Sequence, residues 1–458
     1  MILAADLGST NVKAALFAAD GRGIGEASSA LPYEAQTASR AELSPEAAAG
    51  CFFEVLSGVL ASAGAAADDV RRICLTSQAQ TFCVCDDKGK PVSPFIGWTD
   101  LRAEEEAAEL QALLGDSFHR ETGWPEVRPG HMLSKVLWWR KRHGLPADHR
   151  IVSLPSYLAM RLGAAHASDS NLAAMSGFYT IPDKCWWARA IEAAGVSAAQ
   201  LGPVVETGKP VPTRSESRPP GYSESLEIVF AGNDHTAGAV GCGCRTGRSV
   251  MTLGTAGVYY RWAGREPGPF SANGLWGPYP GGGYYELFHI THACSALDWA
   301  DKYLFGSVDS QRFVESARKA GPDTPFFDPD KWGSGVAWSF RANVEEMAYA
   351  VLEGIAFALR ACAGEAPGAK DDEILILGGG SRLDFWVQLL ANTFRCPFTR
   401  STRDGLDGAA LLAGLIFPDD HSQPPNQCFV PEALRMDELE KRFSLWRSHQ
   451  LEPAKWNA

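Results

Sequence analysis

The sequence predicts an α/β protein whose two halves have a similar build. Short apolar runs with strand character alternate with helix-like segments along the chain. A turn of small residues between two strands occurs at Gly8 and again at Gly254, which suggests an internal repeat. The 458 residues are enough for about two to four domains, and 45% hydrophobic with 21% charged residues is an ordinary globular composition.

Composition also limits the partners and the compartment. The formal charge is −12, whereas domains that bind nucleic-acid backbones are usually basic. The eleven cysteines follow no regular framework, as is typical of reduced thiols. Residues 1–7 lack the basic region of a secretory signal, and no apolar run approaches the roughly 20 residues of a membrane-spanning helix. We therefore expect a cytoplasmic protein that binds neither nucleic acid nor membrane.

The first half begins with a predicted meander of three strands, because apolar runs at residues 2–6, 12–17 and 25–28 are separated by short turns. Ser44 and Pro45 then open a helix that continues to about residue 63, since a hydroxyl N-cap followed by proline is a typical helix start. Two strands follow at residues 71–76 and 81–85. A mostly helical region covers residues 101–141, a segment rich in Pro, Gly and Ser covers 145–220, and another strand lies at 228–231.

The second half repeats the strand pattern and then becomes more helical. Apolar residues four apart, from Met347 to Leu359, predict a helix over residues 344–362. Glycine-rich turns join the elements, and the run from Gly408 to Gly414 is a small-residue helix suited to close backbone packing. The remaining elements are strands at 250–253, 258–262 and 374–377 and helices at 383–394 and 431–447.

The turn after the first strand has the residues of a phosphate site. Backbone N–H groups and hydroxyls at Gly8, Ser9 and Thr10 can surround phosphate oxygens, and Lys13 adds positive charge. Asp6 stands where a divalent cation could be held directly or through water. An ordinary hairpin turn explains the same residues equally well.

Three later glycine-containing turns follow strands. Gly254 and Thr255 repeat the first turn in the second half, and phosphoryl transfer needs donors on several sides of the moving charge. The turn with Gly379 and Gly380 permits close backbone approach by an adenosine or ribose, although it lacks the dinucleotide-binding spacing. Asp234 follows Gly232 and Asn233, so it is either a general base or the N-cap of the next helix.

The order of these motifs resembles the FGGY family of carbohydrate kinases, and its xylulokinase-like branch above all. The similarity runs through nearly the whole chain and includes the motifs 6–13, 98–102, 135–138, 168–171, 232–238, 253–257, 353–354, 378–382 and 408–410. It implies two actin-like, RNase-H-like α/β ATPase domains around a central cleft. The expected domains are residues 1–245, which bind the sugar and carry an inserted subdomain at about 145–220, and residues 246–458, which bind the nucleotide.

The resemblance also implies site roles. Asp6 would handle Mg²⁺, Thr10 and Lys13 would contact the γ-phosphate of ATP beside Gly8 and Ser9, and Asp234 would be the catalytic base that meets the sugar. Nucleotide and phosphate contacts would come from Gly254, Thr255, Gly379, Gly380 and Asp384. The substrate wall would comprise Gln78, Gln80, Trp98, Asp100 and Arg102. Gln78 and Gln80 lie between the predicted strands at 71–76 and 81–85, and alternate residues of such a segment point the same way, so we expect both amides to face the cleft.

The wall sequence departs from the family pattern. Xylulokinases typically carry Gln-Met-His-Gly where this chain has Gln-Ala-Gln-Thr at residues 78–81. This change lies in the substrate wall, so the residues expected to handle phosphate are retained and the identity of the sugar stays open. We expect ATP-dependent phosphorylation of a ketopentose such as xylulose, with ribulose, glycerol or erythritol as alternative substrates and a homodimer as a candidate assembly. The alternatives outside catalysis are an actin-like nucleotide-switched binding protein and a non-catalytic sugar sensor.

Overall fold

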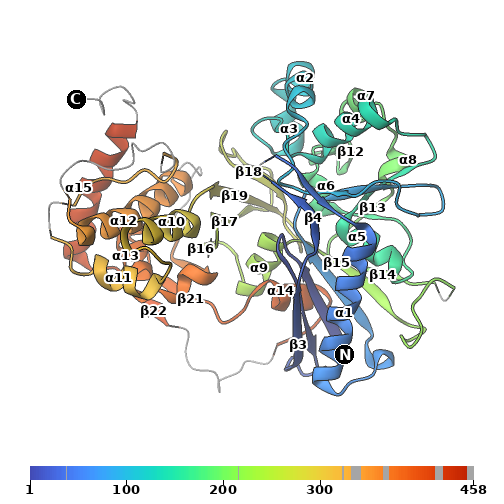
Figure 1. Cartoon of the computed structure of the whole chain (residues 1–458), viewed down its shortest axis with the longest axis horizontal. Coiled ribbons are helices and arrows are strands. Elements are labelled where there is room, and N and C mark those ends of the chain that lie inside the picture. The colour runs from blue at the N-terminus through green and yellow to red at the C-terminus, as the bar shows by residue number, and fades with distance from the viewer. Residues whose placement is uncertain are drawn as a thin grey trace. The chain divides into compact units, whose positions relative to one another are not determined.

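The computed structural model describes residues 1–37, 39–214, 216–321, 324–331, 342–364, 371–417 and 427–450 (Figure 1). The chain forms two compact units. Unit 1 takes its described residues from 1–242, 275–285 and 403–423, and unit 2 takes them from 243–274, 286–402 and 424–458. The two units are therefore not two uninterrupted halves of the chain, because two short segments of the second half pack with the first.

The main sheet of unit 1 has six strands in the order β14-β15-β6-β1-β2-β3. The predicted meander is confirmed, since β1 pairs antiparallel with β2 and β2 with β3. β6 lies parallel to β1, and β15 lies parallel to β6. The carboxyl ends of these three strands therefore meet at one edge of the sheet. The strands are β1 (Ile2–Leu7), β2 (Asn11–Phe17), β3 (Gly23–Ala30), β6 (Arg72–Ser77), β14 (Pro210–Pro212) and β15 (Glu227–Asn233).

Helices cover both faces of this sheet. Alternate residues of a strand point to opposite faces, so the strands contribute apolar side chains to a buried cluster on each face. Leu3, Ala5 and Leu75 share a buried cluster with α1 (Pro45–Ala63), whereas Ala4 and Cys74 share one with α14 (Gly405–Leu412). The predicted start of α1 is confirmed, since the Ser44 side chain accepts a hydrogen bond from the backbone at the third helical position. Helix α1 is long and apolar enough to cross a membrane, but its buried side chains belong to this core, as in a core helix.

Helix α14 packs against α9 (Asp234–Cys242) through glycine. A Cβ atom on Gly408 would lie 1.8 Å from the backbone oxygen of Ala237, and one on Gly241 would lie 2.2 Å from the backbone oxygen of Asp404. The predicted close packing of this small-residue helix is thereby confirmed. The starts of the two helices also meet, since a Cβ atom on Gly405 at the start of α14 would lie 3.7 Å from the backbone oxygen of Asp234 at the start of α9.

The remainder of unit 1 is built on a second sheet of five strands in the order β4-β5-β8-β7-β9. Its strands are β4 (Tyr33–Gln36), β5 (Ala41–Leu43), β7 (Phe82–Cys85), β8 (Phe95–Ile96) and β9 (Arg150–Ser153). The expectation of an inserted subdomain at 145–220 is wrong, because β9 pairs with β7 and β14 pairs with β15. The predicted helical region consists of α2 (Glu104–Leu114), α3 (Ser117–Thr122) and α4 (Met132–His143), separated at Gly115 and Gly123.

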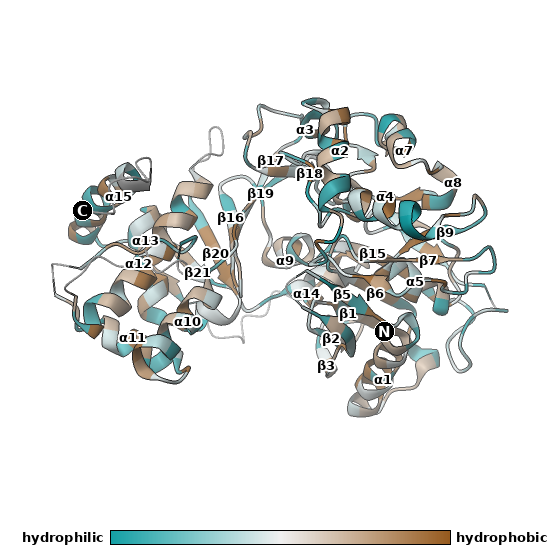
Figure 2. Cartoon of the chain, turned by 45° about the horizontal axis from the view of Figure 1, so that its top comes forward, coloured by the Kyte–Doolittle hydropathy of each residue, from teal (hydrophilic) through white to brown (hydrophobic). Residues whose placement is uncertain are grey.

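Unit 2 repeats the plan of unit 1. Its sheet has the order β19-β17-β16-β20-β21-β22, in which β16, β20 and β21 are parallel neighbours. The apolar strand β20 lies inside it (Figure 2). The bounds are β16 (Arg248–Leu253), β17 (Gly257–Gly264), β19 (Tyr284–Ile290), β20 (Glu373–Leu377), β21 (Phe398–Arg400) and β22 (Cys428–Phe429).

The helices of unit 2 include the predicted long helix, α12 (Val344–Ala363), which is buried along most of its length. It shares one apolar core with residues of the neighbouring helices and strands. The other helices are α10 (Cys294–Phe305), α11 (Ser310–Ala317), α13 (Asp384–Phe394) and α15 (Ala433–Gln450). The strand order β19-β17-β16-β20-β21 corresponds to β3-β2-β1-β6-β15 of unit 1, which confirms the predicted internal repeat.

Candidate active site

The sheet edge of unit 1 brings Asp6 and Asp234 together. Leu7 at the end of β1 is in register with Ser77 of β6, and Ser77 is in register with Asn233 of β15. The ladder is irregular between Phe230 and Asn233, where Gly232 has a φ of +73° that glycine adopts without strain. This irregularity ends the strand and places Asp234 at the start of α9. The charge of Asp234 acts on Asp6 strongly enough to shift the pKa of Asp6.

Asp6 lies in an electrostatically unfavourable place for a lone carboxylate. Burial is the main cause that raises its pKa to about 7, and the charges of Asp234 and Asp404 raise it further, while Lys13 opposes them. Lys13 faces Asp6 in the β1–β2 register. Asp404 was missed by the sequence analysis, because it lies almost 400 residues away along the chain and reaches this site only through the α9–α14 contact.

One oxygen of Asp6, Oδ1, is buried and has no hydrogen-bond partner among the described residues. A buried polar atom without a partner is costly, and a hydrated Mg²⁺ ion would satisfy this oxygen. The residues present therefore fit the ion. No group of three or more His, Cys, Asp or Glu within the described part of the chain is placed to hold a metal by itself, so water and phosphate oxygens would complete the coordination.

Asp234 is partly exposed at the N-terminus of α9, and its Oδ1 accepts a hydrogen bond from the backbone N–H of His235 at 2.9 Å. Asp234 therefore opens helix α9 and is partly exposed, and its role as a general base stays a prediction. Its loop is fixed from two sides. The backbone N–H of Asn233 donates to Oδ1 of Asn171 at 3.0 Å, and the hydroxyl of Thr76 donates to the carbonyl of Gly232 at 3.1 Å. Asn171, in α6 (Ser170–Met175), is thus a positioning residue for which no role was predicted.

The first glycine turn is tied to its surroundings at both ends. The backbone N–H of Gln78 donates to the carbonyl of Leu7 at 3.0 Å, and that of Leu31 donates to the carbonyl of Thr10 at 2.8 Å. Thr10 and Lys13 are exposed, while Gly8 and Ser9 are partly exposed. The turn therefore has a fixed backbone and accessible polar groups, as an anion site requires.

The two wall glutamines do not offer free amides. Oε1 of Gln80 accepts from the backbone N–H of Met132 at 2.7 Å, and its Nε2 donates to the carbonyl of Met175. Gln78 binds Gly8 and Thr81. The expectation that both amides face the same way is wrong, because β6 ends at Ser77 and Gln80 has a left-handed φ of +67°. Strand alternation does not hold in such a turn.

Replacing Gln80 with Leu is expected to lower the free energy of unfolding by about 1–3 kcal/mol, since it leaves the Met132 N–H without its acceptor and removes a donor from the Met175 carbonyl. Urea denaturation measures this loss. Gln80→Asn is the control for backbone strain, because Asn tolerates the left-handed conformation. An unchanged unfolding midpoint in Gln80→Leu would contradict the structural role of the amide.

The Trp98–Arg102 segment divides into an exposed ring and a buried ion pair. The Asp100 carboxylate is 1% exposed and accepts from the backbone N–H of Ala41 and from the Arg102 guanidinium, 2.7 Å away at its shortest. Arg102 also donates to Glu42 at 2.6 Å. Trp98 remains 46% exposed. Asp100 and Arg102 therefore bind each other and the protein, whereas Trp98 and the equally exposed Leu101 present their side chains to solvent.

A buried lysine lies behind this wall. Lys135 in α4 is fully buried, and its Nζ donates to the carbonyls of Gln80 at 3.0 Å and Gly97 at 2.6 Å. Burial lowers its pKa to about 7, with Arg102 acting in the same direction and Asp100 against it. The ammonium group thus joins the two segments of the predicted wall. Lys135 was part of the family resemblance, but nothing in the sequence showed which groups it would meet.

The Lys135→Met variant is expected to change the pH dependence of stability. Burial lowers the pKa from the ordinary 10.5 to about 7, so the unfolded chain binds more protons between these values. The uncharged amine is the form that burial favours. Its contribution to the free energy of unfolding is complete above the unfolded pKa of 10.5 and is lost as the pH falls towards 7. From pH 7 to 9, the free energy of unfolding of the wild type should rise relative to Lys135→Met, by up to about 1.4 kcal/mol per pH unit. Urea denaturation across this range measures it, and parallel profiles would contradict the buried charge.

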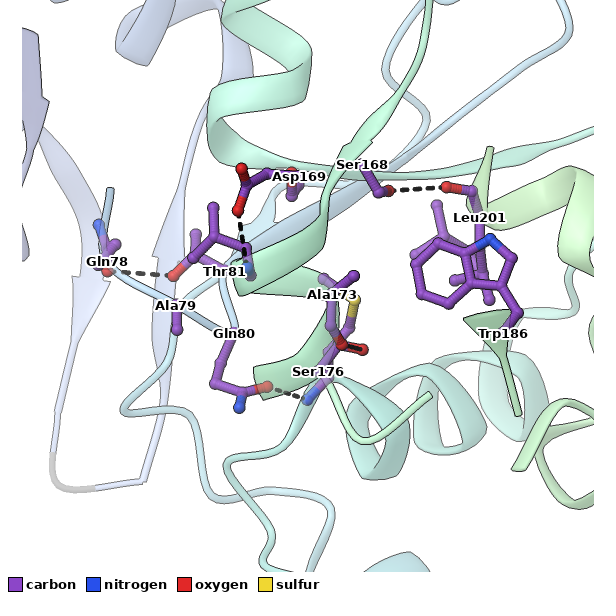
Figure 3. A pocket seen from close by; sticks show the side chains of 14 residues that line it. Gln78, Ala79, Gln80, Thr81, Ser168, Asp169, Ala173, Ser176, Trp186 and Leu201 are labelled. Atoms are coloured by element: carbon purple, nitrogen blue, oxygen red, sulfur yellow. Dashed lines mark hydrogen bonds between the residues drawn. The ribbon is translucent and has the colours of Figure 1, made fainter. Parts of the chain in front are cut away.

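A small cavity of about 20 Å³ lies behind Gln78, Gln80 and Thr81 (Figure 3). It has room for about one water molecule, so it is not a sugar site. Asp169 lines it, and burial raises the pKa of this carboxyl to about 6. Asp169 accepts from the N–H of Leu172 and the hydroxyl of Thr207, which makes it the N-cap of α6 and supports Asn171.

In unit 2, the structure brings two predicted glycine turns together. A Cβ atom on Gly378 would lie 2.4 Å from the backbone oxygen of Leu253, and Gly378 has a φ of +93°. The carbonyls of Gly254 and Thr255 accept hydrogen bonds from backbone N–H groups at the start of α10. Gly379 is exposed and has open space where a side chain would stand, whereas Gly380 is buried. Only residues without a side chain permit this approach of the two backbones.

Asp384 is engaged elsewhere. Its Oδ1 accepts from the Arg400 guanidinium at 2.6 Å, and this contact is the main cause that lowers the pKa of the carboxyl. Arg400 also donates to the carbonyl of Ser381 at 2.7 Å. The carboxylate therefore connects the glycine turn to β21, and its charge is balanced by a neighbouring residue of the protein.

Comparison with solved structures identifies the fold. The chain is similar to ligand-bound xylulose kinase from Lactobacillus acidophilus, with a TM-score of 0.87 at 20% sequence identity over 99% of each chain. Together with the repeated sheet topology, this likeness shows two α/β domains with the actin-like fold.

Sequence comparison then gives the family. The chain matches the model of the "FGGY family of carbohydrate kinases, N-terminal domain" over residues 1–241 and that of the C-terminal domain over residues 249–416. It belongs to the FGGY family of carbohydrate kinases, and is therefore a kinase that uses ATP to phosphorylate a small sugar-like substrate. It is 26% identical to a xylulose kinase of Escherichia coli over 83% of this chain and 84% of that one. It is 27% identical to a glycerol kinase of Solidesulfovibrio magneticus, over 79% and 78%.

Proposed function

We propose that this kinase transfers the γ-phosphoryl group of ATP to a hydroxyl of a ketopentose such as xylulose, with Mg²⁺ as the required ion. The meeting of Asp6 and Asp234 at the sheet edge beside the Gly8–Thr10 turn supports the proposal best. Asp6 has one buried oxygen without a hydrogen-bond partner among the described residues, and Asp234 is partly exposed at a helix start. These environments suit a metal-binding group and a proton acceptor, respectively.

Each residue has a defined role in this mechanism. Asp234 accepts the proton of the attacking hydroxyl as the new bond to phosphorus forms. Lys13 and the polar groups of residues 8–10 stabilise the charge that spreads over the phosphoryl oxygens. When bound through Asp6, Mg²⁺ neutralises phosphate charge. We further propose that residues of unit 1 bind the sugar, and that the glycine turns at 254–255 and 379–380 of unit 2 bind the nucleotide.

The sugar is the finer part of the proposal. The relatives include both a xylulose kinase and a glycerol kinase, so names alone do not select a ketopentose over a polyol such as glycerol or erythritol, or over ribulose. Of the five wall residues, Trp98 presents an exposed ring, while Gln78, Gln80 and the Asp100–Arg102 pair bind protein groups. An aromatic face against the carbon-bound hydrogens of a sugar is therefore the contact that this wall offers.

A coupled assay of ADP release, with Mg²⁺ and a panel of ketoses, aldoses and polyols, tests the proposal. We expect one ketopentose to give a kcat/KM at least about 100-fold above its epimers, since a site built for a given hydroxyl pattern discriminates on this scale. A polyol preferred over all ketoses would reassign the substrate within the kinase class. ADP release that no sugar stimulates would instead indicate a nucleotide-switched binding protein.

A further inference from the structure

We propose that Gln78 is a positioning residue that holds the phosphate turn and joins it to the sugar wall, and that it is not a sugar contact. Gln78 follows directly after β6 and is 5% exposed. The proposal rests on the proposed function, because it takes the turn at Gly8–Thr10 to be the phosphate site.

The hydrogen bonds of Gln78 point to both segments. Its Nε2 donates to the carbonyl of Gly8 at 3.0 Å, in addition to the backbone bond to Leu7. Its Oε1 accepts from the hydroxyl of Thr81 at 3.1 Å (Figure 3). The Thr81 oxygen in turn accepts from the backbone N–H of Trp98 at 3.1 Å. One continuous chain of hydrogen bonds thus runs from Trp98 in the wall to Gly8 in the turn.

This chain fixes the direction of the turn. With the Gly8 carbonyl bound by Gln78 and the Thr10 carbonyl bound by Leu31, the peptide planes between them are fixed before a ligand arrives. Preorganised donors bind a developing charge without the cost of reorganisation. Because the same amide donates to Gly8 and accepts from Thr81, movement at Trp98 is transmitted to Gly8. Sugar binding at the wall should therefore strengthen nucleotide binding at the turn.

Gln78→Met tests the proposal against a matched control, Gln200→Met. Gln200 is also 5% exposed, its Nε2 donates to the Pro146 carbonyl at 3.0 Å, and its Oε1 accepts from the Ser197 N–H at 3.0 Å. The Oε1 of Gln200 also accepts from the Ser197 hydroxyl at 3.3 Å. Both variants therefore remove a buried amide that donates to a backbone carbonyl and accepts from the protein, but only Gln78 binds the turn. Where Gln78→Met does not fold, Gln78→Glu replaces it, since it keeps an acceptor for Thr81 and removes the donor to Gly8.

Two readouts are measured on the full chain. Hydrogen exchange of the amides of residues 8–12 should accelerate in Gln78→Met and remain unchanged in Gln200→Met. The dissociation constant of Mg²⁺–ATP without sugar should rise at least about fivefold in Gln78→Met alone, the loss expected for one hydrogen bond. The KM for the sugar should change much less than that of ATP. Thr81→Val, which breaks the chain between Trp98 and Gln78, should reduce the gain in ATP affinity that saturating sugar provides.

The remaining outcomes overturn the proposal in distinct ways. A raised sugar KM with unchanged ATP affinity in Gln78→Met would make Gln78 a sugar contact. Equal effects in Gln78→Met and Gln200→Met would make it a purely structural residue. A wild type that does not bind Mg²⁺–ATP would refute the proposed function, and exchange at residues 8–12 would still show whether Gln78 holds the turn.

Discussion

Replacing Asp234 with Asn is expected to lower kcat by about 10²-fold or more, since a positioned general base contributes on this scale. The amide has nearly the shape of the carboxylate, and its oxygen still accepts the hydrogen bond from His235, so the loop remains in place. It has no basic oxygen to take the proton of the attacking hydroxyl. Steady-state kinetics, together with equilibrium binding of ATP and sugar, separates the lost chemistry from retained binding.

Asp404→Asn is the matched control for charge. Asp404 acts on Asp6 through its charge as Asp234 does, but its Oδ1 caps α14 by accepting from Leu406 at 2.8 Å, a role that Asn also fills. This variant should change kcat by less than about tenfold. Near-normal turnover in Asp234→Asn, or equal losses in the two variants, would refute the assignment of Asp234 as the base.

Asp6→Asn is expected to reduce turnover by about 10³-fold, because it removes the charge that would hold the metal ion at the phosphates. The affinity for Mg²⁺–ATP should fall more than that for free ATP. Titration of activity with Mg²⁺, and calorimetry with each nucleotide form, measure the two effects. Equal loss of affinity for both forms would indicate a structural role.

The same variant should be more stable than the wild type at high pH and without Mg²⁺. The pKa of Asp6 is raised to about 7, so its protonated form stabilises the fold below the unfolded pKa, and this contribution is lost as the pH rises through 7. Asn carries no such charge. Thermal unfolding at pH 5 and pH 8 should therefore favour Asp6→Asn at the higher pH, and Mg²⁺ should raise the Tm of the wild type only. A variant less stable at both pH values would contradict the buried-charge account.

The sequence predicts well those features that depend on neighbours along the chain. The helix start at Ser44 and the strands that end at Asp6 and near Asp234 follow from local patterns, and the parallel strands then bring both carboxylates to one edge. The amide partners of Gln80 did not follow, because Met132 and Met175 come from helices that the turn meets only in the fold. The protein partners of Asp100 and Arg102 did not follow for the same reason: Ala41, which donates to Asp100, and Glu42, which accepts from Arg102, lie some sixty residues away.

Substitution tolerance should differ sharply between the two parts of the site. At the α9–α14 contact, any residue larger than glycine at 241 or 408 collides with backbone, which has no side-chain end to move aside. Trp98 in the wall is 46% exposed, so other side chains fit there. A scan of all substitutions should therefore show almost no tolerance at Gly241 and Gly408 and wide tolerance at Trp98. A lineage with this fold can drift from one sugar to another while the pair of helices that carries its chemistry stays fixed.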